Sequence, residues 1–260
     1  MNSENNNLAF KGAIFDLDGV ITKTAVVHAS AWKVMFDEYL QRVAQREQVP
    51  FKAFTYEQDY LTYVDGKPRY KGVQSFLESR EIFLDWGAPS DHPDQETVCG
   101  LGNRKNIKFQ DVLERDGIDV YTSTVRFIDE LKARFIHVGV ASSSKNCEYI
   151  LKSAELEDRF ETRVDGVISV ELGLKGKPAG DIFIRAAQNM GVKPAEAIVI
   201  EDAVSGVQAG VNGKFGLVIG VAREGNEEDL KKNGADIVIP DFAEYSVDQV
   251  QQWFKEKNSI

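Results

Sequence analysis

The sequence predicts an α/β fold, in which a doubly wound parallel sheet forms the core and an α-helical cap domain is inserted into it. Three observations predict this organisation. From about residue 119 onward, short apolar runs alternate with amphipathic helical stretches, as in parallel strands joined by helical crossovers. The opening run "GAIFDLD" resembles those later runs, and the sequence between them contains no convincing strand. The first strand is therefore expected to join a sheet whose other strands come after the insert.

The predicted core comprises residues 1-25 and 110-260, and the predicted cap comprises residues 26-109. Within the cap, the stretch from 26 to 48 places Trp32, Met35 and Phe36 at helical spacing on one face, which predicts a long amphipathic helix. The rest of the cap is expected to be helix and loop.

The core elements follow in order after the cap. Apolar runs predict strands at 137–141, 164–170, 197–202, 215–222 and 235–240. Amphipathic stretches predict helices at 123–135, 146–156 and 181–191.

Composition excludes several classes of function. The net charge of −10 disfavours nucleic acid as a partner, although a small anion can still be held by a few cationic groups. Cys99 and Cys147 lack metal-type spacing, and no apolar run is long enough to span a membrane. The polar N-terminal residues do not resemble a signal peptide. We therefore expect a cytoplasmic, monomeric protein that contacts neither nucleic acid nor membrane.

Chemically active side chains follow several of the predicted strands. In an open parallel sheet, ligands bind beyond the carboxyl ends of the strands. The residues expected at this edge are Asp16, Asp18, Ser142, Ser143, Ser144, Lys145, Asn146, Lys177, Glu201 and Asp202.

These residue types suit phosphoryl transfer. Carboxylates without nearby His or Cys form an oxygen-only site that suits Mg²⁺, while lysine and serine can bind a phosphoryl group. A carboxylate can also act as the nucleophile. Alternate strand residues point to the same side, so Asp16 and Asp18 are expected to address one reacting group.

Each motif also has a structural explanation. "DLDG" is a common turn, and "GKP" is a common loop. "ASSSKN" can cap a helix through Ser144 or Asn146, and "ED" can complement a helix dipole. Their shared position at strand ends favours the functional interpretation.

Taken in order, "DLDGVIT", "VASSSKN", "GKPAGDIF" and "IEDAVSGVQAG" resemble the four motifs of the haloacid dehalogenase superfamily, which has a Rossmann-like core. The resemblance implies that Asp16 is the nucleophile and Asp18 the general acid and base. It assigns phosphoryl binding to Ser142 and Lys177, with Ser143 beside them. Mg²⁺ is implied at Asp16, Asp202, Glu201 and the Asp18 carbonyl.

Further motifs are similar to the β-phosphoglucomutase-like branch, whose helical cap follows the first motif. The resemblance implies contacts with the substrate or within the cap for His28, Trp32, Arg69, Lys105, Ser144, Lys145 and Asn146. For Arg69 and Lys105, a solvated cap surface is the competing interpretation. Lys23, Gly180 and "VYTST" depart from the usual pattern and leave the substrate open.

The first functional hypothesis is a Mg²⁺-dependent phosphatase that hydrolyses a small sugar phosphate through an aspartyl phosphate on Asp16. The alternative is a β-phosphoglucomutase, which interconverts β-glucose 1-phosphate and glucose 6-phosphate. A hypothesis of another class is a non-catalytic phosphate-binding protein on the same fold, which the complete set of motifs disfavours.

Overall fold

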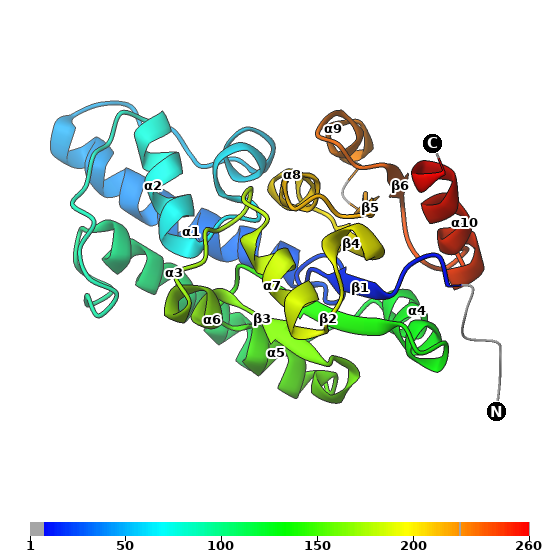
Figure 1. Ribbon diagram of the computed structural model, residues 1–260. Coiled ribbons are helices and arrows are strands. Elements are labelled where there is room, and N and C mark those ends of the chain that lie inside the picture. The colour runs from blue at the N-terminus through cyan, green and yellow to red at the C-terminus, as the bar shows by residue number, and fades with distance from the viewer. Residues whose placement is uncertain (1–7, 224, 260) are drawn as a thin grey trace. The chain divides into compact units, whose positions relative to one another are not determined.

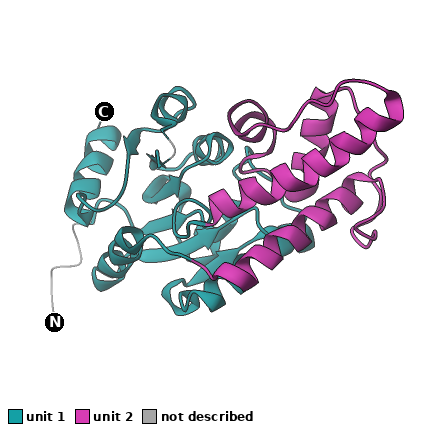
Figure 2. Cartoon of the chain, turned by 180° about the vertical axis from the view of Figure 1, so that it is seen from behind, with its two compact units in different colours: residues 1–23, 119–260 teal, residues 24–118 magenta. Residues whose placement is uncertain are grey.

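The computed structural model describes residues 8–223 and 225–259. They divide into two compact units (Figure 2), one containing the chain up to Lys23 together with the chain from Asp119 onward, and the other comprising Thr24–Ile118. The second unit extends further than the expected cap of residues 26-109 because its last helix, α3, continues to Asp116.

Within the described residues, the first unit contains a six-stranded sheet in the order β3-β2-β1-β4-β5-β6, and every neighbouring pair is parallel (Figure 1). The strands are β1 (Gly12–Phe15), β2 (His137–Ala141), β3 (Thr162–Val164), β4 (Ala197–Glu201), β5 (Leu217–Val221) and β6 (Ile237–Ile239). The predicted α/β class with a parallel sheet is confirmed, and the first strand lies at the centre of that sheet.

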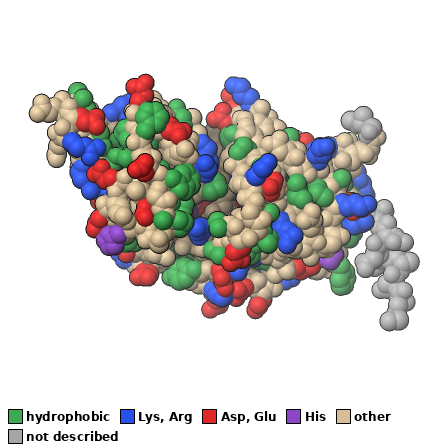
Figure 3. All heavy atoms as spheres, turned by 60° about the vertical axis from the view of Figure 1, so that its left-hand side comes forward, with side chains coloured by type: hydrophobic (Ala, Val, Ile, Leu, Met, Phe, Trp, Pro, Cys, Tyr) green, Lys and Arg blue, Asp and Glu red, His purple; other side chains and the backbone are tan. Residues whose placement is uncertain are grey.

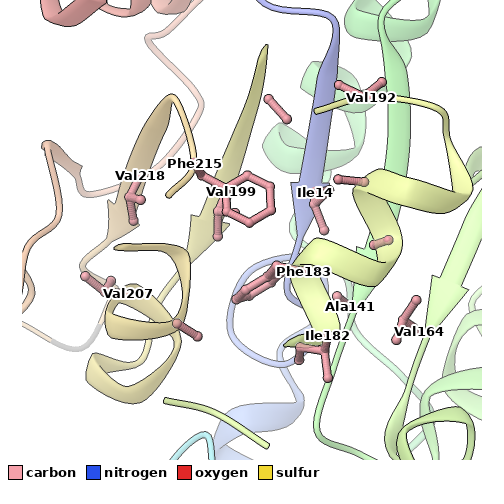
Figure 4. Packing of buried hydrophobic residues seen from close by; sticks show 14 of the residues in the cluster. Ile14, Ala141, Val164, Ile182, Phe183, Val192, Val199, Val207, Phe215 and Val218 are labelled. Carbon is pink, nitrogen blue, oxygen red and sulfur yellow. The ribbon is translucent and has the colours of Figure 1, made fainter. Parts of the chain in front are cut away.

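Helices pack on both faces of the sheet because successive residues of a buried strand point to opposite sides. Ile14 belongs to a hydrophobic cluster with Phe183 of α7 and Val207 of α8 (Figure 4), whereas the Phe15 ring lies 6.4 Å from the ring of Phe127 in α4. The helices of this unit are α4 (Thr122–Ala133), α5 (Cys147–Ser153), α6 (Gly166–Glu171), α7 (Asp181–Asn189), α8 (Val204–Asn212), α9 (Glu227–Lys232) and α10 (Val247–Asn258), with short 3-10 turns η2 (Glu157–Arg159) and η3 (Pro194–Glu196).

The strand predicted at 164–170 is wrong. Strand β3 ends at Val164, and helix α6 begins two residues later because the buried Asp165 carboxylate accepts hydrogen bonds from the amides of Val167 (2.9 Å) and Ile168 (3.0 Å). This side chain caps the helix and so ends the extended conformation.

The second unit consists of helices and loops, contains no strand in its described residues, and has its own aromatic core. Its elements are α1 (Thr24–Glu47), the π-helix η1 (Tyr56–Val64), α2 (Arg69–Ser79) and α3 (Val98–Asp116). The Phe36 ring contacts the rings of Trp32, Phe54 and Phe76, with centroid separations between 4.2 and 5.3 Å. The expected long amphipathic helix is α1, whose buried apolar face carries Trp32, Met35 and Phe36.

Surface charge is mixed. On the face shown in Figure 3, Lys and Arg side chains are interspersed with Asp and Glu rather than gathered into a basic stripe. None of the helices in the described part of the chain combines the length and apolar character that membrane crossing requires.

Candidate active site

The loop that carries Asp16 and Asp18 begins where the central strand β1 ends. The amide of Asp16 donates to the carbonyl of Ile200 (2.9 Å), and the Asp16 side chain is buried. The loop is then closed on itself, since the Leu17 carbonyl accepts from the Thr22 amide (3.0 Å) and the Gly19 amide donates to the Thr22 carbonyl (2.8 Å). Both aspartates lie beyond Phe15, the last residue of β1, so the loop bonds on either side of Asp18 hold its backbone in place of strand pairing.

Lys177 connects the first strand end to a neighbouring one. Its ammonium donates to Asp16 Oδ1 (2.5 Å) and to Glu201 Oε1, and the side chain is almost completely buried. The register of the sheet explains this contact, because Phe15 lies opposite Ile200 and the residue that follows each of them, Asp16 or Glu201, is a carboxylate. Burial lowers the pKa of Lys177, but Asp16 and Glu201 outweigh burial and hold that pKa above its usual value. Lys177 is therefore a cation.

The positive charge of Lys177 does not balance the acidic cluster. Burial raises the pKa of Asp16, Lys177 opposes this effect, and the charges of Glu201 and Asp18 reinforce it, so that the pKa lies well above its usual value. A further cation beside Asp16 would favour its ionised form.

Three carboxylates are arranged to hold such a cation. Asp16, Glu201 and Asp202 each offer an oxygen within 4.8 Å of the others, and such an oxygen-only donor set fits Mg²⁺. The Asp18 carboxylate is not part of this group within the described chain, so its metal contact through the backbone carbonyl stays a prediction.

Two glycines make room for these carboxylates. A Cβ atom on Gly19, whose φ is +84°, would lie 1.7 Å from Asp202 Oδ2. A Cβ atom on Gly206 in α8 would lie 1.7 Å from Glu201 Oε1. The second oxygen of Glu201 accepts from the Ala203 amide (2.8 Å), so this carboxylate is held on both sides. Any side chain at either glycine would displace a member of the cluster.

The second predicted motif forms a tight turn after β2. The Ser142 hydroxyl accepts from the Ser144 amide (3.0 Å), and the Ser144 hydroxyl accepts from the Asn146 amide (3.1 Å). Asn146 occupies the N-cap position of α5 without a side-chain capping bond. These turns fix the backbone that carries Ser143 and Lys145, and Ser142 and Asn146 are both buried.

In the second unit, Lys105 is buried rather than solvated. Its ammonium contacts His28 Nδ1 and lies 5.1 Å from the Trp32 ring and 4.6 Å from the Phe109 ring. The His28 ring stacks on Phe109 at a centroid separation of 3.9 Å. This cluster brings together three of the predicted cap residues and adds Phe109.

Arg69 lies at the start of α2 and is half-buried. Its guanidinium donates to Asn106 Oδ1 (2.7 Å), and burial lowers its pKa. Of the predicted substrate and cap residues that lie in the second unit, His28, Trp32 and Lys105 thus form one cluster, and Arg69 lies apart from it with Asn106.

Sequence reasoning missed Arg223 and Asn226. Arg223 Nε donates to the carbonyl of Gly19 (3.1 Å), and Asn226 Nδ2 donates to the carbonyl of Asp202 (2.9 Å). Both residues follow the apolar run of β5. The rule that ligand-binding residues follow the ends of parallel strands, applied to this run as well, would have found Arg223.

A central parallel strand that ends in a buried aspartate, joined by lysine to a second acidic strand end, is the arrangement expected of haloacid dehalogenase-like hydrolases. The model of the haloacid dehalogenase-like hydrolase family matches residues 10–213, so the chain belongs to this family. It is therefore an enzyme of the phosphatase and phosphomutase class, which sets aside the non-catalytic hypothesis.

The relatives place the chain in the β-phosphoglucomutase-like branch. It is 46% identical over 237 residues to a β-phosphoglucomutase of Mycobacterium tuberculosis, covering 90% of each chain. It is also 30% identical over 246 residues to the β-phosphoglucomutase of Bacillus subtilis, covering 94% of this chain and 95% of the relative. The crystal structure of a β-phosphoglucomutase from Clostridium difficile has the same fold, with a TM-score of 0.75 and 24% identity over 96% of this chain and 100% of that one. The predicted superfamily and branch are confirmed.

Proposed function

We propose that this enzyme transfers a phosphoryl group of a small sugar phosphate through an aspartyl phosphate on Asp16. The observation that carries the proposal is the position of Asp16, which is buried at the end of the central strand, bonded to Lys177 and close to Glu201 and Asp202. A carboxylate nucleophile divides one difficult displacement into two easier steps.

In the first step, an Asp16 oxygen attacks phosphorus and the bond between phosphorus and the sugar oxygen breaks. Asp18 donates a proton to the departing oxygen. In the second step, Asp18 removes a proton from the acceptor hydroxyl, which attacks phosphorus and releases Asp16. The Lys177 ammonium and the Ser142 hydroxyl donate to phosphoryl oxygens, with Ser143 beside them. When bound by Asp16, Glu201 and Asp202, Mg²⁺ would offset negative charge on the phosphoryl group.

We propose that the acceptor is a sugar hydroxyl, so that the net reaction is that of a β-phosphoglucomutase. Support comes from two relatives with this name, which match this chain over at least 90% of its length. The residues proposed to bind the sugar or its second phosphate are His28, Trp32, Arg69, Lys105, Ser144, Lys145 and Asn146. A further part of the proposal is a cytoplasmic monomer. Cys99 and Cys147 are buried thiols that form no disulfide within the described residues, which suits a reducing compartment.

Net hydrolysis, with water as the acceptor, is the second candidate. The matching family is described as haloacid dehalogenase-like hydrolase, and this description favours net hydrolysis. Both reactions use the same phosphoenzyme, so only the products distinguish them.

The test combines the purified protein with Mg²⁺, β-glucose 1-phosphate and glucose 1,6-bisphosphate, and separately with a panel of sugar phosphates. Glucose 6-phosphate and free phosphate are measured independently. Isomer without phosphate release supports the mutase, and stoichiometric phosphate release supports the hydrolase. Asp16→Asn should abolish both reactions, whereas the exposed Asp129→Asn should leave them unchanged. Full activity in Asp16→Asn would refute the proposed nucleophile.

A further inference from the structure

We propose that Arg223 is a positioning residue that fixes the catalytic loop through the Gly19 carbonyl. Arg223 follows strand β5, and its side chain is only 9% exposed. Its Nε donates to the Gly19 carbonyl (3.1 Å), one residue after Asp18 in the sequence. The role in catalysis rests on the proposed function of Asp16 and Asp18, but the effect on the loop itself does not.

Three other contacts fix the direction of this bond. One terminal nitrogen of Arg223 pairs with the Asp241 carboxylate, and the other donates to Thr124 Oγ1 (3.0 Å). The guanidinium carbon lies 3.5 Å from the centroid of the Tyr121 ring. A planar guanidinium presents several donors in a rigid arrangement, which a single ammonium cannot reproduce. The Nε–H group is therefore aimed at Gly19 by residues from two other parts of the first unit.

Asp241 is itself held in place. Its Oδ2 accepts from the Ser123 hydroxyl (2.8 Å), and its Oδ1 accepts from the Ala243 amide (2.6 Å). The ion pair with Arg223 is thus anchored at both of its ends, so it acts as a fixed support for the loop.

Gly19 is a sensitive point for such a support. Its φ of +84° is accessible mainly to glycine, and the Asp202 carboxylate occupies the space where a Cβ atom would lie. A displacement of Gly19 would move the Cα atom that faces the Asp202 carboxylate and would also shift the preceding Asp18. A second side chain, Asn226, supports the Asp202 carbonyl (2.9 Å). Arg223 therefore acts on the aspartate loop and on the metal cluster together.

Arg126 provides a matched control. Its guanidinium donates to the carbonyls of Phe242 (2.9 Å) and Ala243 (2.9 Å), in the same segment that carries Asp241. These bonds do not involve Gly19, so Arg126→Met removes an arginine anchor of this segment without acting directly on the catalytic loop, although Arg126 is exposed and Arg223 is not.

The experiment compares Arg223→Lys, Arg223→Met and Arg126→Met with the wild-type protein. Amide hydrogen exchange, read by mass spectrometry, measures protection of the loop amides of Gly19, Ile21 and Thr22. Steady-state kcat and KM are measured with p-nitrophenyl phosphate and Mg²⁺, and melting temperature monitors folding. Arg223→Lys retains a positive charge opposite the half-buried Asp241, so it separates positioning from the loss of the ion pair.

Both Arg223 variants should exchange these amides at least about tenfold faster and lose at least about tenfold in kcat, while KM changes by less than about threefold. Arg223→Lys should melt near the wild-type temperature. Arg126→Met should match the wild-type protein in loop exchange and in kcat.

Unchanged loop exchange in Arg223→Lys would overturn the proposal, and so would faster exchange with an unchanged kcat. Equal effects in Arg126→Met would also overturn it, because they would reflect a general loss of stability. If the wild-type protein turned over no phosphate ester, the proposed function would fail. The exchange comparison would still decide whether Arg223 fixes the loop.

Discussion

Gly206→Ala tests the idea that Glu201 positions Lys177. A Cβ atom at residue 206 would lie 1.7 Å from Glu201 Oε1 and 1.9 Å from its carboxyl carbon. Because Glu201 is 1% exposed, the carboxylate cannot swing into solvent and must retreat within the core by more than an ångström. The same Oε1 atom accepts from Lys177, so this retreat breaks the contact that anchors the lysine.

Two opposing effects determine the change in stability. Alanine is favoured over glycine within a helix by about 1 kcal/mol. Loss of one partner from a buried ion pair costs about 3 kcal/mol. The variant should therefore lose about 2 kcal/mol in the free energy of unfolding. Displacement of Lys177 by an ångström should lower kcat about 100-fold, because transfer depends on the placement of the reacting groups.

The assay measures kcat with p-nitrophenyl phosphate and Mg²⁺ together with denaturant unfolding. Gly210→Ala in the same helix is the control, since its added Cβ would meet methyl groups of Val218 and Val199 at 3.0 to 3.3 Å and would not touch Glu201. Overpacking there costs about 1 kcal/mol, which the preference of a helix for alanine offsets, so neither the free energy of unfolding nor kcat should fall comparably. If Gly206→Ala retained kcat within about threefold, Glu201 would not be the anchor of Lys177.

Three further predictions concern other parts of the molecule. Lys105→Met should change the melting temperature little, because the apolar side chain between aromatic rings offsets the lost contacts of the ammonium with the rings and with His28. It should lower the proposed mutase activity at least about tenfold, and unchanged activity would make Lys105 purely structural. Burial raises the pKa of Asp59, but bonds from Arg80 and Thr55 outweigh burial and lower it, so the carboxylate stabilises the fold above the usual pKa of an aspartate and less as the pH falls below that value. Asp59→Asn should therefore cost about 2 kcal/mol at neutral pH in denaturant unfolding and weaken the loss of stability in acid, and an unaltered acid profile would contradict this. Mg²⁺ at about 100 times its dissociation constant should stabilise the protein by about 2.7 kcal/mol in thermal unfolding, and EDTA should remove this effect. The variant Asp202→Asn should show no such stabilisation. If Mg²⁺ stabilised Asp202→Asn as much as the wild-type protein, this cluster would not be the binding site.

The sheet and much of its candidate active edge were predictable because buried parallel strands are continuous apolar runs. Asp16, Ser142 and Glu201 stand out where such runs end, since a charged or polar residue is costly there without a partner. Local sequence was sufficient for these positions.

Other features depend on contacts that local sequence does not show. The run at 164–170 is apolar enough for a strand, and only the capping bonds of Asp165 make its second part a helix. The bond from Arg223 to Gly19 joins residues far apart in the chain. The need for a glycine at residue 206 arises only in the folded protein, where the Glu201 carboxylate occupies the space that a Cβ atom would fill. Sequence periodicity contains no information on such pairings.

The central place of β1 has a consequence for biosynthesis. This strand is made first, yet its two neighbours, β2 and β4, begin at residues 137 and 197. At typical translation rates, the ribosome takes about 5 to 20 s to make the intervening Thr24–Ile118 segment. During that interval an apolar strand has no partner along either side, whereas the helical segment can collapse around its own aromatic rings. The nascent chain is therefore expected to present β1 to chaperones before its sheet can form.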